Sequence, residues 1–215
     1  MSHKSATELR FCDLSFARIL EQMVMIQARP RHRYTYAQYV AVENDSPIKH
    51  EFFDGEIYAL AGGTEDHSAL SANVIGALIG LVGDHPCRVH TSDLRIYVEE
   101  VGFATFPDAA VVCGPFQQHA PSPKATATNP TILVEVTSDS SEDSDTGAKL
   151  DAYRTIPALR EYVIVSHRER RILVHRRGSE GTWTTSVAIS GGRMKLETLG
   201  GELNVDAIYR GSSIL

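Results

Sequence analysis

Two short, strongly apolar segments that each carry one acidic residue constrain the fold of this chain more than any other feature. They are "FPDAAVV" at 106–112 and "ILVEVTS" at 132–138. Their Val, Ile and Ala content and their length predict buried strands. Asp108 and Glu135 are therefore unexpected, because a carboxylate that leaves water without a partner is strongly destabilised. Each acid needs a reason, either a function or a buried ion pair.

The chain has 215 residues, of which 42% are hydrophobic and 22% charged, an ordinary globular composition. This length allows one domain with an extension, and a core that needs no disulfide or metal. Apolar positions recur with helical spacing over 6–29, and Pro30 ends that segment. We therefore expect an N-terminal helical extension over 1–33 and a domain over 34–215. Apolar residues on the first helix would suit a second copy, which favours a homodimer.

Charge and cysteine content limit the partners and the compartment. A formal net charge of −6 argues against phosphate binding by the whole surface, but not against a local basic groove. No segment approaches about 18 consecutive apolar residues, and the N-terminus lacks the pattern of a secretory signal, so no membrane association is expected. Cys12, Cys87 and Cys113 are odd in number without a tight framework, which favours a reducing cytoplasm. With His90 and His119 their spacings match no common zinc motif.

Local signals place helices and strands in a mixed order. Asp54-Gly55 is a favoured two-residue turn between two strand-like arms. A helix is predicted from a cap at Thr64 or Asp66 to a stop at Gly83. The Pro-, Ala- and Ser-rich segment 114–130 predicts a long surface loop. Strands dominate the centre, with helices before and between them, so the expected fold class is α/β or α+β.

Asp108 and Glu135 lie on successive strands, so side-by-side pairing of these strands is expected. Two neighbouring carboxylates repel each other in a partly dry site unless a cation lies between them. A hard divalent ion is the natural occupant, Mg²⁺ above all with Mn²⁺ as a substitute, and the carbonyl of Val136 could add an oxygen ligand. The alternative is a buried ion pair of Glu135 with an arginine such as Arg154 or Arg160.

Lys149 is the third member of this candidate site. It stands in the first turns of the helix predicted after Glu135, with Leu150 and Tyr153 toward the core. A lysine beside a metal-bound water can stabilise hydroxide and the charge that develops on a phosphate. Two acids, one lysine and Mg²⁺ suit hydrolysis of a phosphodiester. Without the acids, Lys149 would be interpreted as a solvated helix residue.

Four segments resemble those of a known family. "FPDAAVV", "ILVEVTS" and "AKLDAYRTIPALREYVIV", with "YTYAQYVAVENDSPIKHEFFDGEIYALAGGTEDHSALSANVIGAL" before them, resemble the Uma-two family of predicted endonucleases. That family belongs to the PD-(D/E)XK restriction-endonuclease-like superfamily. The resemblance covers about residues 34–177. It implies a mixed β-sheet flanked by helices, Mg²⁺ dependence and cleavage of phosphodiester bonds in nucleic acid, with DNA as the expected substrate.

The family's functional residues carry over to named positions. Asp108 matches the acid of the "PD" motif, and Glu135 matches the second acid. The wider superfamily places its lysine at position 137, which is Thr137 here. The Uma-two family resembles this chain in moving that lysine to the following helix, so Lys149 takes the role. The resemblance thus implies a catalytic set of two acids and a displaced lysine.

Two other residues match the family with open roles. Glu51 is either an auxiliary ligand or water-positioning group, or an exposed strand residue. His67 matches a frequent histidine of the family, and the alternative is that it supports the helix start. The basic segment 167–177 either tracks phosphates or forms a solvated hairpin edge. A run of acids complements a helix macrodipole and needs no ligand: Asp139, Glu142, Asp143 and Asp145.

These observations predict a metal-dependent endodeoxyribonuclease that binds nucleic acid. The alternative is a non-catalytic nucleic-acid- or protein-binding module on the same fold, in which the acid pair is vestigial. A binding module has no need of two close acids, which favours the enzyme. Metal-dependent turnover would distinguish the two hypotheses.

Overall fold

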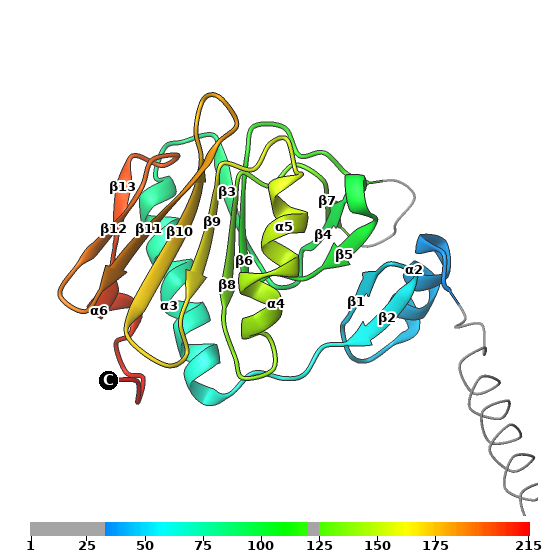
Figure 1. Ribbon diagram of the computed structural model, residues 1–215, viewed down its shortest axis with the longest axis horizontal. Helices are drawn as coiled ribbons and strands as arrows, with labels where there is room; N and C mark the ends of the chain where they lie inside the picture. The colour runs from blue at the N-terminus through cyan, green and yellow to red at the C-terminus, as the bar shows by residue number, and fades with distance from the viewer. Residues whose placement is uncertain (1–32, 120–124) are drawn as a thin grey trace, which may run out of the picture. The chain divides into compact units, whose positions relative to one another are not determined.

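The computed structural model describes residues 33–119 and 125–215, which contain two main β-sheets (Figure 1). The larger sheet comprises β3 (Cys87–Thr91), β6 (Ala109–Cys113), β8 (Ile132–Val136), β9 (Glu161–Val165), β10 (Arg171–Arg177) and β11 (Trp183–Ile189). Its strand order is β11-β10-β9-β8-β6-β3. Only β8 and β9 of this sheet pair in parallel, and the other neighbours are antiparallel. The predicted mixed sheet is confirmed.

The smaller sheet has the order β2-β1-β5-β4-β7. Its strands are β1 (His50–Phe53), β2 (Glu56–Ala59), β4 (Arg95–Val98), β5 (Phe103–Thr105) and β7 (Thr126–Ala127). Asp54 and Gly55 join β1 to β2 with φ of 48° and 78°, as the hairpin turn requires. The sequence predicted this hairpin, but β5 was not predicted, and β7 falls in the segment expected to be a loop.

Helices and a hairpin cover both faces of the larger sheet (Figure 1). They are α3 (Glu65–Val82), α4 (Glu142–Thr146), α5 (Ala148–Arg154), α6 (Val205–Ile208) and the pair β12 (Arg193–Leu196) and β13 (Gly201–Asn204). The helix α2 (Tyr36–Asp45) packs on the smaller sheet. A short 3₁₀ turn, η1 (Glu99–Val101), precedes β5. Thr64 caps α3 and Gly83 follows its last residue, as predicted.

Burial on both faces explains why β8 is almost continuously apolar. Ile132 and Val134 belong to the core shared with α3, while Leu133, between them, packs in the core shared with α5 and the smaller sheet. A strand covered on both sides has no solvent face on which polar residues could alternate. Side chains alternate between the two faces of a strand, so Glu135 lies on the same face as Leu133, toward α5. Its carboxylate is away from water there and needs a partner within the protein.

Two of the cysteines form a disulfide that was not predicted from the sequence. Cys87 and Cys113 stand directly opposite each other on β3 and β6 and form a disulfide. The two cysteines are 26 residues apart in sequence, and only the antiparallel register of β3 and β6 brings them together. Because disulfides persist in oxidising surroundings, the cysteines give no support to a reducing cytoplasm, and that location stays a prediction.

The predicted helix over 6–29 lies outside the described residues, and so does the basis for the predicted homodimer. The residues Tyr34–Leu215 form one unit in themselves. Within the described ranges, no helix combines the length and the apolar character that a membrane span requires.

Candidate active site

Asp108 lies immediately before β6 and opposite Glu135 of β8. The antiparallel register pairs Ala109 with Val134, and one further step along it matches the two acids. The Val136 N–H donates to Oδ2 of Asp108 at 2.8 Å, which fixes the carboxylate across the strand pair. The predicted pairing of the two acidic strands is therefore confirmed in position.

Glu135 is buried, with 4% of its surface exposed. Its Oε1 accepts a hydrogen bond from the Tyr153 hydroxyl at 2.8 Å and lies 3.4 Å from Nζ of Lys149. Burial raises the pKa of Glu135 to about 8, against the opposing charge of Lys149 and with the help of the nearby acids Asp145 and Asp108. Negative charge at this position is therefore under-compensated by the protein alone.

Lys149 is buried at the centre of three carboxylates and is not a solvated residue. Its Nζ lies 2.9 Å from Oε1 of Glu51 and 3.1 Å from Oδ1 of Asp145, in addition to Glu135. Burial alone would lower the pKa of Lys149, but Glu135, Asp145 and Glu51 raise it well above its usual value. The ammonium group is thus held in its charged form beside the strand ends.

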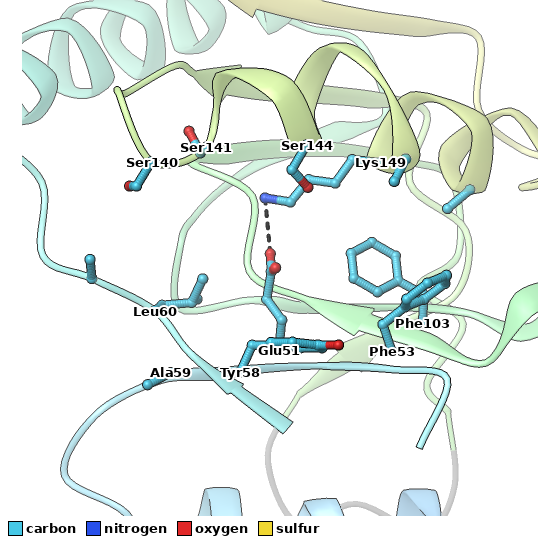
Figure 2. A pocket seen from close by; sticks show the side chains of 13 residues that line it. Glu51, Phe53, Tyr58, Ala59, Leu60, Phe103, Ser140, Ser141, Ser144 and Lys149 are labelled. Carbon is cyan, nitrogen blue, oxygen red and sulfur yellow. Dashed lines mark ion pairs between the residues drawn. The ribbon is translucent and has the colours of Figure 1, made fainter. Parts of the chain in front are cut away.

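Glu51 reaches this cluster from β1 of the smaller sheet. The Thr105 hydroxyl of β5 donates to its Oε1 at 2.5 Å, and the same oxygen pairs with Lys149 (Figure 2). Figure 2 shows the Glu51 side chain extending from its strand toward Nζ of Lys149. Interpretation of Glu51 as an exposed strand residue is therefore wrong.

Asp145 belongs to the same cluster, and sequence reasoning missed it. The helix-macrodipole explanation is wrong for this residue, because Asp145 is only 1% exposed. Burial raises its pKa, opposed by the charge of Lys149 and by a hydrogen bond with Ser141. The spacing of Asp145 and Lys149 by four residues was the signal that could have found it.

Gly147 separates α4 from α5 and allows both acid and lysine to point inward. Its backbone has φ of −119° and ψ of −99°, and a Cβ there would lie 2.8 Å from the carbonyl oxygen of Asp143. The single helix predicted after Glu135 is replaced by two short helices. A glycine permits this tight joint where a side chain would force the backbone apart.

His67, in the first turn of α3, lies beside Asp108. Its Nε2 is 3.4 Å from Oδ2 of Asp108, and its main-chain N–H donates to the cap residue Thr64 at 3.2 Å. The hydrogen bond with Asp108 raises the pKa of His67, with burial opposing it and a further hydrogen bond to the main chain of Val136 adding to it. His67 thus serves the helix cap through its backbone and the acid site through its ring.

Another buried acid, Glu161, has partners that fully compensate its negative charge. Glu161 at the start of β9 accepts from Nε of Arg176 at 2.9 Å. It also accepts from the N–H groups of Glu197 and Thr198 at 3.0 and 3.1 Å. Glu135 has no such arrangement, since its ion pair is with a lysine that two other acids share. The predicted alternative of an arginine partner for Glu135 is wrong: Arg154 instead pairs with Asp151 at 3.5 Å.

The basic segment 167–177 is mostly engaged within the molecule. Arg168 pairs with Asp139 at 3.0 Å and Glu142 at 2.6 Å. The guanidinium of Arg177 donates to the carbonyls of Pro157 and Arg154. These contacts argue against a surface kept free for phosphates, and the predicted hairpin edge is wrong for β10, which pairs with β9 and with β11.

A cavity of about 360 Å³ opens beside the Glu51–Lys149 pair (Figure 2). Residues of the β1–β2 hairpin form one wall, and residues of α4, α5 and the preceding turn form the other. The lining consists of Glu51, Phe53, Tyr58, Ala59, Leu60, Ala61, Phe103, Ser140, Ser141, Ser144, Ala148, Lys149 and Ala152. A charged end therefore adjoins a mainly apolar one.

The donor set determines which metal these residues fit. Within 33–119 and 125–215, no three His, Cys, Asp or Glu side chains converge as a ready-made metal cluster. Mg²⁺ does not need one, because it commonly binds through one or two carboxylates and keeps several waters. The oxygens of Asp108 and Glu135 and the raised pKa of Glu135 fit such a hard cation.

Comparisons with known proteins find relatives of this chain and a structure with a similar fold. Two uncharacterised proteins of Synechocystis sp. are 33% and 31% identical to this chain, over 81% and 69% of it and 90% and 84% of their own lengths. A crystal structure from Anabaena variabilis, described as "a putative nuclease belonging to DUF820", matches with a TM-score of 0.65 and 15% identity. The match covers 80% of this chain and 96% of that one, and it shows the fold.

A family model identifies the relationship. The model of the Uma2 family, described as "Putative restriction endonuclease", matches residues 36–206. This match includes Glu51, Asp108, Glu135 and Lys149, and it extends beyond the stretch in which the motifs resemble the family. Because it spans well over half of the chain, the protein belongs to the Uma2 family.

Proposed function

We propose that this protein is a metal-dependent endonuclease that hydrolyses phosphodiester bonds, with DNA as its substrate. The observation that carries the proposal is the convergence of acidic residues on one buried lysine at the ends of β6 and β8. Replacing a buried ion cluster by apolar groups is often neutral or stabilising, so this cluster is weak evidence for a structural role and favours chemistry. Membership of the Uma2 family supports the same reaction class.

Asp108, Glu135 and the carbonyl of Val136 would hold Mg²⁺, or Mn²⁺ as a substitute. When bound, such an ion acts as a Lewis acid toward a phosphoryl oxygen and lowers the pKa of a water molecule. The Val136 N–H and the His67 ring orient the Asp108 carboxylate for this task. His67 is therefore a positioning residue in the proposal.

Lys149 would stabilise the negative charge that develops on the phosphate. Its ammonium stays protonated because three carboxylates surround it, so it serves as a hydrogen-bond donor and a fixed positive charge rather than as a base. Glu51 and Asp145 hold the ammonium from two different elements, at 2.9 and 3.1 Å. Such preorganisation avoids reorientation of the lysine during the reaction.

Cleavage of plasmid and single-stranded DNA with Mg²⁺, with Mn²⁺ and with EDTA tests the proposal. Asp108→Ala is the inactivating variant, and Glu180→Gln, at an exposed position between β10 and β11, is the matched control. We expect metal-dependent cutting by the wild type and the control, with loss of activity in Asp108→Ala. Absence of turnover on both DNA forms would favour the non-catalytic binding module.

A further inference from the structure

We propose that the cavity beside Glu51 and Lys149 binds one unstacked nucleobase, so that the substrate is a single strand or a locally unpaired site in a duplex. The position of the reacting phosphate rests on the proposed function. The base site has an independent basis in the chemistry of the cavity itself. Both a charged end and an aromatic end are present, as a nucleotide requires.

Three aromatic side chains, those of Phe53, Tyr58 and Phe103, line the cavity together with Glu51 and Lys149. Phe53 lies on β1 and Tyr58 on β2, the two paired strands of the hairpin. Their side chains are 39% and 47% exposed. Phe53 packs edge-on against Phe103 with ring centroids 5.7 Å apart. Large aromatic side chains that remain this exposed in a cavity offer a stacking surface, and base–aromatic stacking is the usual means of holding an unpaired base.

The aromatic end connects directly to the acid cluster. Phe103 lies 6.1 Å from the ring of Tyr153, whose hydroxyl donates to Glu135 at 2.8 Å. Glu51 and Lys149 also line the cavity while forming part of the cluster. A base held against Phe53 would therefore belong to a nucleotide adjacent to the phosphate that Lys149 contacts.

The opposite wall supplies hydroxyl groups. Ser140, Ser141 and Ser144 line the cavity from the turn before α4 and from α4 itself (Figure 2). The first two are linked through Ser138 at 3.1 Å, which orders this turn. Hydroxyl groups both donate and accept hydrogen bonds, so they can meet the edges of different bases without strict sequence preference.

A base within a regular duplex cannot occupy this cavity. Both of its faces are stacked on neighbouring bases, and its edge is paired, so entry requires that it leave the helix. The energetic cost is small for a single strand or a bulge and larger for a paired base. The cavity therefore predicts a preference for unpaired nucleic acid that the acid cluster alone would not impose.

Three oligonucleotides of the same sequence test the preference: a single strand, a fully paired duplex and a duplex with one unpaired base. Two variants change the cavity in opposite ways. Phe53→Ala removes a ring on which a base could stack. Ala148→Trp, at an exposed position of α5, fills the cavity. Val187→Ala and Thr184→Trp, both exposed on β11, are the matched controls. Circular dichroism and thermal melting establish that each variant is folded.

We expect the wild type to cleave the single strand and the unpaired site at least about tenfold faster than the paired duplex. Each cavity variant should lower kcat/KM on those two substrates by about tenfold, in line with one lost stacking contact, while the controls keep wild-type rates. Equal cleavage of paired and unpaired substrates, or wild-type rates in both folded cavity variants, would overturn the inference.

A binding measurement separates this inference from the proposed function. If no substrate is cleaved with any metal, the nuclease proposal fails, and fluorescence anisotropy then decides the cavity. The probes are a short labelled single strand and its backbone analogue without bases. Tighter binding of the strand with bases, weakened by Ala148→Trp, supports the base site; equal binding of both probes rejects it.

Discussion

Nζ of Lys149 lies 3.1 Å from Oδ1 of Asp145, one helical turn earlier in the chain, although Gly147 separates the two short helices that carry them. Both side chains are buried, and Nζ of Lys149 also pairs with Glu51 and Glu135. Asp145 therefore holds the ammonium group from the same segment of the chain, while Glu51 of β1 and Glu135 of β8 hold it from two strands. Removal of either member should affect the proposed reaction differently.

Lys149→Met should lower kcat by about 100- to 1,000-fold, because a fixed positive charge at the reacting phosphate is lost. Asp145→Asn should lower kcat by about tenfold with little change in KM, because the lysine remains but is less firmly oriented. Steady-state kinetics with Mg²⁺ measures both effects. Asp143→Asn, an exposed acid in the same helix, is the control. Equal loss in Asp145→Asn and the control would contradict a specific role for Asp145.

Much of this site could be predicted from local sequence. An acid inside an almost continuously apolar strand is conspicuous, and two such strands in succession predict their own pairing. The register then matches Asp108 with Glu135 without any further information. The same holds for the Asp54-Gly55 turn, because its backbone conformation depends on those two residues alone.

The remaining features depend on contacts between distant segments. Glu51 reaches Lys149 only because the smaller sheet packs on the same side of β8 as α5. Asp145 appears within a run of acids that are otherwise exposed or half-buried, so its burial follows from the joint at Gly147 rather than from its neighbours. The Cys87–Cys113 disulfide likewise arises from register between β3 and β6.

Glu135→Gln should stabilise the metal-free protein by about 1 kcal/mol while abolishing cleavage. Burial raises the pKa of Glu135 to about 8, so the carboxylate form is disfavoured in the folded state. A glutamine can still accept the Tyr153 hydrogen bond, and Lys149 keeps its pairs with Glu51 and Asp145. Denaturant unfolding in EDTA measures the change in the free energy of unfolding.

Glu161→Gln is the matched control for that experiment. Its carboxylate receives a guanidinium and two main-chain N–H groups, so neutralisation should destabilise the fold by about 1–3 kcal/mol. Opposite signs for the two Glu→Gln variants are expected. A loss of stability in Glu135→Gln comparable with that in Glu161→Gln would show that Glu135 is a structural ion-pair residue.

The imidazole of His175 should make the protein less stable in mild acid. It is buried on β10, with Nδ1 2.9 Å from the Thr185 hydroxyl, and burial lowers its pKa with help from the charge of Arg154. Below the ordinary histidine pKa of about 6.5, the unfolded chain takes up a proton that the folded protein does not. The free energy of unfolding therefore falls as pH drops through that value toward the lowered pKa.

His175→Gln should reduce this fall, and His85→Gln, at an exposed position, should not. Urea unfolding of the three proteins across mildly acidic to neutral pH measures the slopes. Parallel curves for the wild type and His175→Gln would show that another group controls acid sensitivity.

Loss of the Cys87–Cys113 disulfide should lower the free energy of unfolding by about 2–4 kcal/mol, because the bond restricts the unfolded chain. Cys87→Ser with Cys113→Ser should match the wild type in reductant, and Cys12→Ser should behave as the wild type in both conditions. β6 begins directly after Asp108, but main-chain and α3 contacts hold that acid independently of the disulfide. Cleavage activity at moderate temperature should therefore persist in the double variant. Mass spectrometry after alkylation without reductant provides the direct check, and modification of both Cys87 and Cys113 under those conditions would contradict the bond.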